Sequence, residues 1–134
     1  MQLIRTGIIS LVALLSSVIA LSGEVTNTFK FVTRKPGSET LVPIKAAHLS
    51  DANVGITVEG AGAADGDHQV HLSIYDGNGR EYIQIVRTVR ARGQHWYFCF
   101  LHGYDKGIDS PGTWTYVVDL DGKLLISETL SVVP

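Results

Sequence analysis

Short apolar runs alternate with clusters of glycine, aspartate and asparagine along most of the chain. No stretch keeps apolar residues at helical spacing for three turns, whereas apolar and polar positions often alternate one by one, which is typical of half-buried strands. We therefore expect strands and very little helix. The expected strands are 28–33, 44–49, 54–59, 69–75, 80–91, 94–102, 113–119 and 123–133.

The number and spacing of these strands predict the fold class. Seven or eight short strands with frequent turn signals favour an all-β, immunoglobulin-like antiparallel β-sandwich. The chain has no internal repeat and no linker, so residues 21–134 are expected to form one domain. Cys99 is the only cysteine, which excludes an internal disulfide and leaves core packing to hold the domain together.

Side-chain alternation in the three middle strands predicts a common core face, because a one-residue slip in register would reverse every side chain. A two-residue turn at 92–93 would place Val89 opposite Trp96. The preceding hairpin would then place Leu72 opposite Ile83 on the same face. The expected core members from these strands are Val70, Leu72, Ile74, Ile83, Ile85, Val89, Trp96, Phe98 and Phe100.

The last two strands are predicted to meet at a bulged loop. A two-residue turn at Asp121 and Gly122 would mix apolar and polar side chains on both faces. A three-residue loop over 120–122, with Gly122 left-handed in a bulge, separates them. With this loop, the apolar side chains of the two strands fall on one face and join the expected core; they are Trp114, Tyr116, Val118, Leu124 and Ile126.

This C-terminal hairpin resembles a known type of domain. The segments Pro111 to Tyr116 and Asp121 to Lys123, followed by a final strand that ends in Leu130, Ser131 and Val132, are similar to the closing hairpin of small bacterial exported immunoglobulin-like domains of unknown function. The resemblance covers residues 111–133. It implies a fold and no activity, because function depends on sites and not on folds.

The N-terminus has the pattern of a cleavable signal peptide. Arg5 precedes an apolar run from Thr6 to Leu21, and small or β-branched residues lead up to Ala20. The run is shorter than the roughly 20 apolar residues of a membrane span. We expect cleavage after Ala20, removal of residues 1–20, no remaining membrane span, and a secreted or periplasmic domain.

Composition and motifs exclude several function classes. The formal net charge of −2 does not fit a nucleic-acid binder, which would carry a concentrated basic face. We find no cofactor motif and no nucleophile–base arrangement, so we expect neither a cofactor nor enzymatic activity. His68 and His71 are three residues apart, but strand alternation turns them to opposite faces. A periplasmic copper or zinc carrier stays open as an alternative function.

The outer face of the middle strands is the expected binding surface. Tyrosine, histidine and arginine surround a small apolar centre there, as at protein interfaces. This face should carry His71, Ser73, Tyr75, Tyr82, Gln84, Val86, Thr88, Arg90, His95, Tyr97, Cys99 and Leu101. The residues expected to contact a partner are Tyr75, Tyr82, Arg90, His95 and Tyr97.

Other interpretations of this face remain. The N-terminal segment or the loop 60–67 would turn it into a second, minor core if either covered it. Tyr75, Tyr82 and Tyr97 would serve a carbohydrate-binding module as stacking platforms. The arginines near residue 90 would protect a sheet edge, and we expect Arg87 either to lie at such an edge or to extend its charged group outward to solvent. A protein partner is the leading expectation and a glycan the alternative.

Overall fold

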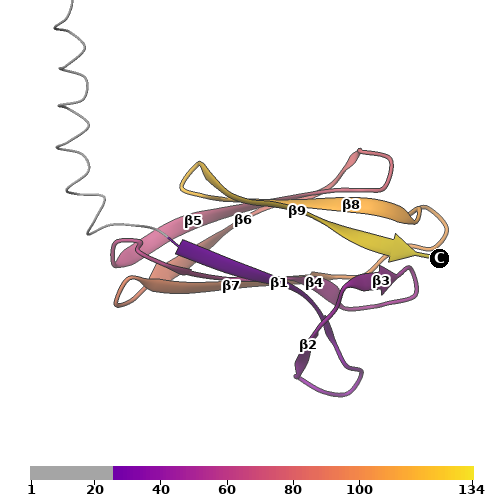
Figure 1. Cartoon of the computed structure of the whole chain (residues 1–134), viewed down its shortest axis with the longest axis horizontal. Helices are drawn as coiled ribbons and strands as arrows, with labels where there is room; N and C mark the ends of the chain where they lie inside the picture. The colour runs from indigo at the N-terminus through magenta and orange to yellow at the C-terminus, as the bar shows by residue number, and fades with distance from the viewer. Residues whose placement is uncertain (1–25) are drawn as a thin grey trace, which may run out of the picture.

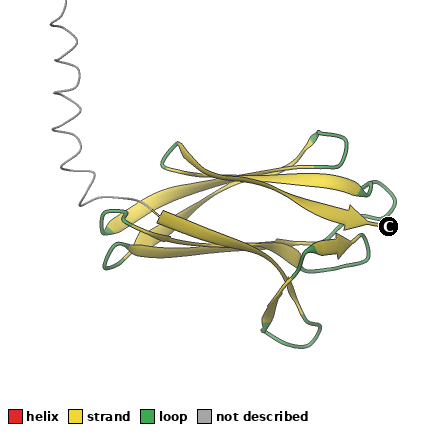
Figure 2. Cartoon of the chain, in the orientation of Figure 1, coloured by secondary structure: helices red, strands yellow, loops and turns green. Residues whose placement is uncertain are grey.

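The computed structural model describes residues 26–134, which consist of strands and loops alone (Figure 2). The signal peptide expected at residues 1–20 lies outside the described residues. Residues 26–134 contain no helix of the length and apolarity that crossing a membrane requires. The described strands are β1 (Thr26–Arg34), β2 (Leu41–Pro43), β3 (Ala46–His48), β4 (Val54–Ala61), β5 (Gly66–Tyr75), β6 (Glu81–Ala91), β7 (His95–His102), β8 (Gly112–Leu120) and β9 (Lys123–Val133).

The strands form two sheets that stack face to face (Figure 1). The first sheet has the order β2-β1-β4-β7, and the second has the order β3-β9-β8-β5-β6. Every neighbouring pair is antiparallel except β3 and β9, which are parallel. The expected class, an immunoglobulin-like β-sandwich, is confirmed.

The core lies between the sheets and is built from alternate residues of each strand. Along β8, Trp114, Tyr116 and Val118 are fully buried, whereas Thr115 and Val117 between them are partly exposed. The most deeply buried side chains also include Ile56, Leu72, Ile74, Leu130, Val54, Val58, Val70 and Val132. No disulfide is needed, since burial of these apolar side chains supplies the main stabilising free energy.

The inward and outward directions expected along β7 are confirmed. Trp96 and Phe98 are each only 4% exposed, and Phe100 packs against the core. Tyr97 is 52% exposed on the opposite face, and Cys99 is a partly exposed free thiol beside it.

The expected hairpin between β6 and β7 is wrong. Val89 does not lie opposite Trp96, because β6 pairs with β5 in the second sheet and β7 pairs with β4 in the first. Only an isolated bridge between Arg92 and His95 joins the two strands near their turn. Both strands keep their apolar sides inward, so alternation alone does not tell one sheet from two facing sheets.

The register between β5 and β6 also differs from the expected one. Leu72 pairs with Ile85 and Ile74 with Ile83, so the strands are shifted by two residues and their faces are unchanged. The cause is the loop after β5, where the Asp76 carboxylate accepts hydrogen bonds from the backbone N–H groups of Asn78 and Arg80, each at 2.9 Å. This loop is one residue longer than expected, and the bulge between Ile74 and Tyr75 supplies the second residue of the shift. Arg87 lies exposed on the edge strand β6, as expected.

The predicted three-residue loop between β8 and β9 is wrong. Asp121 and Gly122 form a two-residue turn with φ angles of 51° and 85°, the left-handed pair that a type I′ turn requires. The bulge lies further along, where Asp119 faces Leu124 but Val118 faces Ile126. Ile126 is therefore buried as expected, whereas Leu124 points outward and is 59% exposed.

His68 ties this turn to a neighbouring loop. Its Nδ1 lies 2.5 Å from the Asp121 carboxylate, and its Nε2 lies 2.6 Å from the Ala64 carbonyl oxygen. Both partners are acceptors, so a doubly protonated ring satisfies both bonds. Its hydrogen bond to Asp121 raises the pKa of His68 above the ordinary 6.5. The pKa of Asp121 falls below 3.8, mainly because its carboxylate accepts a backbone hydrogen bond from Gln69.

The signs of these two pKa shifts define a pH window for the contact. Because the pKa of His68 is raised in the folded protein, this contact stabilises the fold fully below pH 6.5. The stabilisation is lost as the pH rises through the higher pKa of the folded state. The lowered pKa of Asp121 stabilises the fold above pH 3.8 and is lost in stronger acid. Asparagine at position 121 keeps the Gln69 hydrogen bond and tolerates a positive φ. We therefore expect Asp121→Asn to lower the free energy of unfolding by up to about 1 kcal/mol near pH 5. Urea unfolding should show no difference at pH 9, and an equal loss at both pH values would contradict the assignment.

Candidate functional site

Two long strand edges are free on the same side of the sandwich. β6 (11 residues) closes the second sheet, and β7 (8 residues) closes the first. β6 carries Arg87 and Arg90, which discourage pairing with another strand. β7 has the sequence HWYFCFLH and contains no lysine, arginine, aspartate or glutamate. The edge of β7 therefore lacks the usual protection.

The turn between these strands is held by the loop before β5. Gly93 and Gln94 both have left-handed φ angles, 60° and 68°. The Gln94 N–H donates to the Asp65 carboxylate at 2.7 Å, and the Gly62 N–H donates to the Gln94 carbonyl at 3.0 Å. The turn therefore fixes the backbone positions from which the Arg92 and His95 side chains extend.

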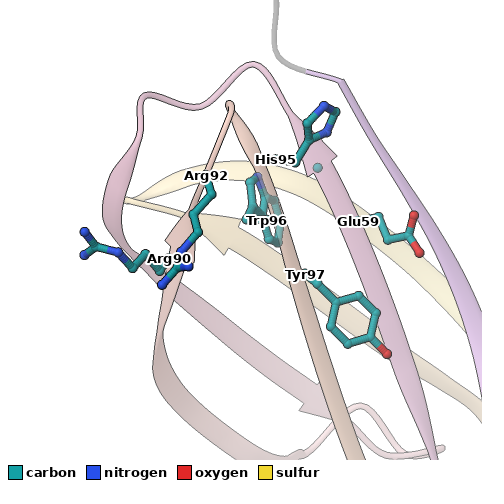
Figure 3. Close-up of a pocket in the computed structure, with 7 residues that line it drawn as sticks. Glu59, Arg90, Arg92, His95, Trp96 and Tyr97 are labelled. Carbon is teal, nitrogen blue, oxygen red and sulfur yellow. The ribbon is translucent and has the colours of Figure 1, made fainter.

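A groove of about 420 Å³ opens beside this turn (Figure 3). Arg90 lies at the end of β6, Glu59 comes from β4, and the turn and the start of β7 supply the remaining side chains. Figure 3 shows the two arginines on one side and Glu59 on the other, with the aromatic residues between them. The residues lining the groove are Glu59, Gly60, Arg90, Arg92, His95, Trp96 and Tyr97.

Trp96 reaches the groove because its strand partner is a glycine. Gly60 pairs with Trp96 across β4 and β7, and a Cβ atom at Gly60 would lie 2.2 Å from the indole Nε1. The indole thus packs directly on the β4 backbone. Its Nε1–H is buried and finds no hydrogen-bond acceptor within residues 26–134. A buried donor without an acceptor is costly in free energy.

Tyr97 offers an exposed aromatic surface at the same place. It pairs with Glu59 in a row that continues to Thr28 on β1. Partial burial, and to a lesser extent the neighbouring Cys99, raise the pKa of the Tyr97 hydroxyl above 10. The hydroxyl is therefore protonated at neutral pH and can both donate and accept hydrogen bonds.

The two arginines differ in their surroundings. Arg90 forms an ion pair with Asp67 across β5 and β6 at 3.0 Å, and both side chains are well exposed. Exposed pairs of this kind contribute little stability, so Arg90 can exchange Asp67 for another carboxylate. Among residues 26–134 the Arg92 guanidinium has no side-chain hydrogen bond or ion pair.

Three of the residues expected to contact a partner come together, and two do not. Arg90, His95 and Tyr97 line the groove. Tyr75 lies on the outer face of the second sheet, paired with Thr115, because β5 and β7 belong to different sheets. The expected continuous outer face of the middle strands is therefore wrong.

The placement of Tyr82 on an outer face is also wrong. Its ring packs edge-on against Trp114 with centroids 4.8 Å apart, and its hydroxyl donates to the Gly103 carbonyl at 3.2 Å. Burial raises the pKa of Tyr82 to about 12. The bulge after Ile74 moves the start of β6 out of strict alternation, and Tyr82 turns toward the core margin.

Sequence reasoning did not find Glu59 and Gly60 as members of the site. Their position depends on the pairing of β4 with β7, and more than thirty residues of chain separate these two residues from β7. The available signal was Gly60 itself, since a glycine inside an apolar strand indicates the close approach of another group. Trp96 was expected only as a core residue.

The histidines do not gather into a metal site. His68 contacts Asp121, whereas the nearest carboxylate to His71 is Asp119 at 3.9 Å. In residues 26–134 no three side chains of histidine, cysteine, aspartate or glutamate are grouped to hold a metal ion.

A second polar cluster is buried at the opposite end of the sandwich. His102 Nε2 lies 2.6 Å from the Tyr116 hydroxyl, and its Nδ1 lies 2.9 Å from the Gly103 carbonyl. Burial lowers the pKa of His102, so the ring is neutral and donates through Nδ1 while accepting from Tyr116. Both ring nitrogens are thus occupied within the fold, which gives His102 a structural role.

Solved structures share this fold at low sequence identity. An immunoglobulin-like protein from Pseudomonas aeruginosa is 12% identical with a TM-score of 0.56, over 83% of this chain and 98% of that protein. A β-glucosidase from Listeria innocua is also 12% identical, with a TM-score of 0.55, and the match spans 83% of this chain but only 16% of the enzyme. No protein-family model matches the chain, and no curated protein matches it. The similarity therefore shows an immunoglobulin-like fold.

Proposed function

We propose that this protein is a non-catalytic, exported binding domain that recognises a protein partner through the groove beside β7. The observation that carries the proposal is the groove in which His95 and Tyr97 of the edge strand β7 meet Arg90 of β6. Tyrosine and arginine are enriched among the few interface residues that contribute most of the binding free energy. The N-terminal pattern at residues 1–20 supports export.

The groove is small compared with a whole interface. Stable protein complexes bury about 800 Å² on each partner, so the partner must also contact the surroundings of the groove. Val86 of β6 is exposed on the outer face of the second sheet, paired with His71, and does not line the groove. We place the centre of the interface at Tyr97, the most exposed aromatic side chain of the groove.

A carbohydrate-binding module is less well supported than a protein-binding one. The stacking platform expected for it needs Tyr75, Tyr82 and Tyr97 on one face, and the structure separates all three. Of these three tyrosines, Tyr97 is the one whose side chain is exposed. The β-glucosidase match reflects the shared fold and assigns no ligand to this chain.

Substitution of two exposed groove residues tests the proposal. We expect Arg90→Ala with Tyr97→Ala to reduce capture of the native partner from extract at least tenfold, because interface tyrosine and arginine side chains often contribute about 2 kcal/mol each. Capture is measured by quantitative mass spectrometry on immobilised domain.

The control is Val86→Ala, which shortens an exposed side chain outside the groove. Thermal melting should be nearly unchanged in both variants, since the replaced side chains are exposed. Equal capture by the wild type and the double variant would refute the groove as the binding surface.

A further inference from the structure

The groove presents more unsatisfied hydrogen-bond donors than acceptors. The Arg92 guanidinium and the Trp96 indole N–H have no acceptor among residues 26–134. Arg90 is partly neutralised by Asp67, and Glu59 is the one carboxylate that lines the groove. Figure 3 shows Glu59 beyond Tyr97, on the side away from the arginines. The arginine side of the groove therefore favours a ligand with an anionic acceptor.

The backbone beside these donors favours a peptide over a polysaccharide. One edge of β7 is hydrogen-bonded to β4. On its other edge, within residues 26–134, the isolated bridge between His95 and Arg92 is the one strand-like contact. The edge from Trp96 to His102 thus presents N–H and C=O groups without a strand partner. An extended peptide can satisfy these groups by adding a strand, and a polysaccharide has no equivalent backbone.

Resting on the proposed function, we infer that the groove receives an acidic peptide strand of the partner. The strand pairs with the free edge of β7 and places a carboxylate on the Arg92 guanidinium. Planar guanidinium groups bind carboxylates with two parallel hydrogen bonds, and the Arg92 guanidinium has no partner of this kind among residues 26–134. Glu59 repels the carboxylate from the opposite side, which fixes the orientation of the strand.

The indole resonances of the protein provide a direct test. The chain has two tryptophans, and the Trp114 Nε1–H already donates to the Ser110 carbonyl at 3.0 Å. Trp96 lines the groove and Trp114 does not, so in ¹H–¹⁵N spectra the Trp96 indole should report the ligand while Trp114 serves as the internal control. The probes are three peptides of the length of β7 in which valine alternates with glutamate, glutamine or lysine.

We expect the glutamate peptide to shift the Trp96 indole resonance in a saturable manner and to leave that of Trp114 in place. The glutamine peptide should bind about tenfold more weakly, because a charge-assisted hydrogen bond is lost. Arg92→Gln should weaken the glutamate peptide by a similar factor. The matched control is Arg87→Gln, since Arg87 is an exposed arginine of the same region outside the groove.

Equal binding of the glutamate and lysine peptides, or no shift of Trp96 with any peptide, would overturn the inference. A Trp96 shift with polygalacturonate and none with the glutamate peptide would also overturn it in favour of an acidic polysaccharide. Capture of a partner that depends on Tyr97 and Arg90, combined with failure of the peptide, would refute the acidic strand and leave the proposed function standing. Peptide binding without groove-dependent capture would refute the proposed function instead.

Discussion

Gly55→Ala should destabilise the domain by at least about 3 kcal/mol, which is a large part of the 5–15 kcal/mol that holds a domain of this size. Gly55 lies in β4 opposite Leu101 of β7. A Cβ atom at this position would lie 1.7 Å from the carbonyl oxygen of Phe100, which belongs to the backbone and cannot rotate away. The substitution must therefore push β7 away from β4.

Urea unfolding measures this loss, and Gly107→Ala is its control. A Cβ atom at Gly107 would meet its nearest atom, in the Asp105 side chain, at 3.5 Å, an ordinary contact. We expect this control to change the free energy of unfolding by less than about 0.5 kcal/mol. If Gly55→Ala were equally mild, the close pairing of β4 with β7 would be wrong.

Trp114→Ala should cost about 3–5 kcal/mol, the range found when large buried aromatic side chains are truncated. Trp114 is completely buried, and its ring packs edge-on against Tyr82 and Tyr104 with centroids 4.8 and 5.1 Å apart. Alanine would leave a cavity among these rings and remove the hydrogen bond to Ser110.

Trp114→Phe separates the two contributions. Phenylalanine fills most of the cavity but cannot donate to the Ser110 carbonyl, so we expect a smaller loss than with alanine. Guanidinium unfolding compares the three proteins. A loss below about 1 kcal/mol for Trp114→Ala would show that Trp114 does not occupy the centre of the core.

The sequence was sufficient for the fold class and for the direction of most side chains. Strict alternation along β7 placed Trp96 and Phe98 inside and Tyr97 outside, and the structure confirms all three. Alternation is a local property with a period of two residues, so it survives errors in strand pairing. The two-residue shift between β5 and β6 left the faces of Leu72, Ile74 and Ile85 correct for the same reason.

Strand pairing could not be predicted from the same pattern. An apolar face is buried equally well in a hairpin of one sheet or against a facing sheet, and the short turn at Gly93 and Gln94 is compatible with either. The correct choice depends on β4, a distant strand that takes β7 as its partner. The composition of the candidate site could not be predicted for the same reason, because Glu59 and Gly60 line the groove only when β4 pairs with β7.

The position of Tyr82 illustrates a second limit. The bulge between Ile74 and Tyr75 disturbs alternation at the start of β6, and nothing in the alternation itself indicates where a bulge falls. The turn between β8 and β9 shows the reverse case. Asp121–Gly122 is a strong signal for a two-residue turn, and a bulge further along the hairpin reconciles it with the apolar pattern.

The separation of β6 and β7 into facing sheets is the arrangement on which the groove and its free edge depend, and nuclear Overhauser contacts between backbone protons test it most directly. We expect contacts between β4 and β7 around the pair Val58 and Phe98, and none between β6 and β7 around Arg87 and Phe98. Regular contacts along β6 and β7 as a hairpin, with β7 unpaired to β4, would contradict the account.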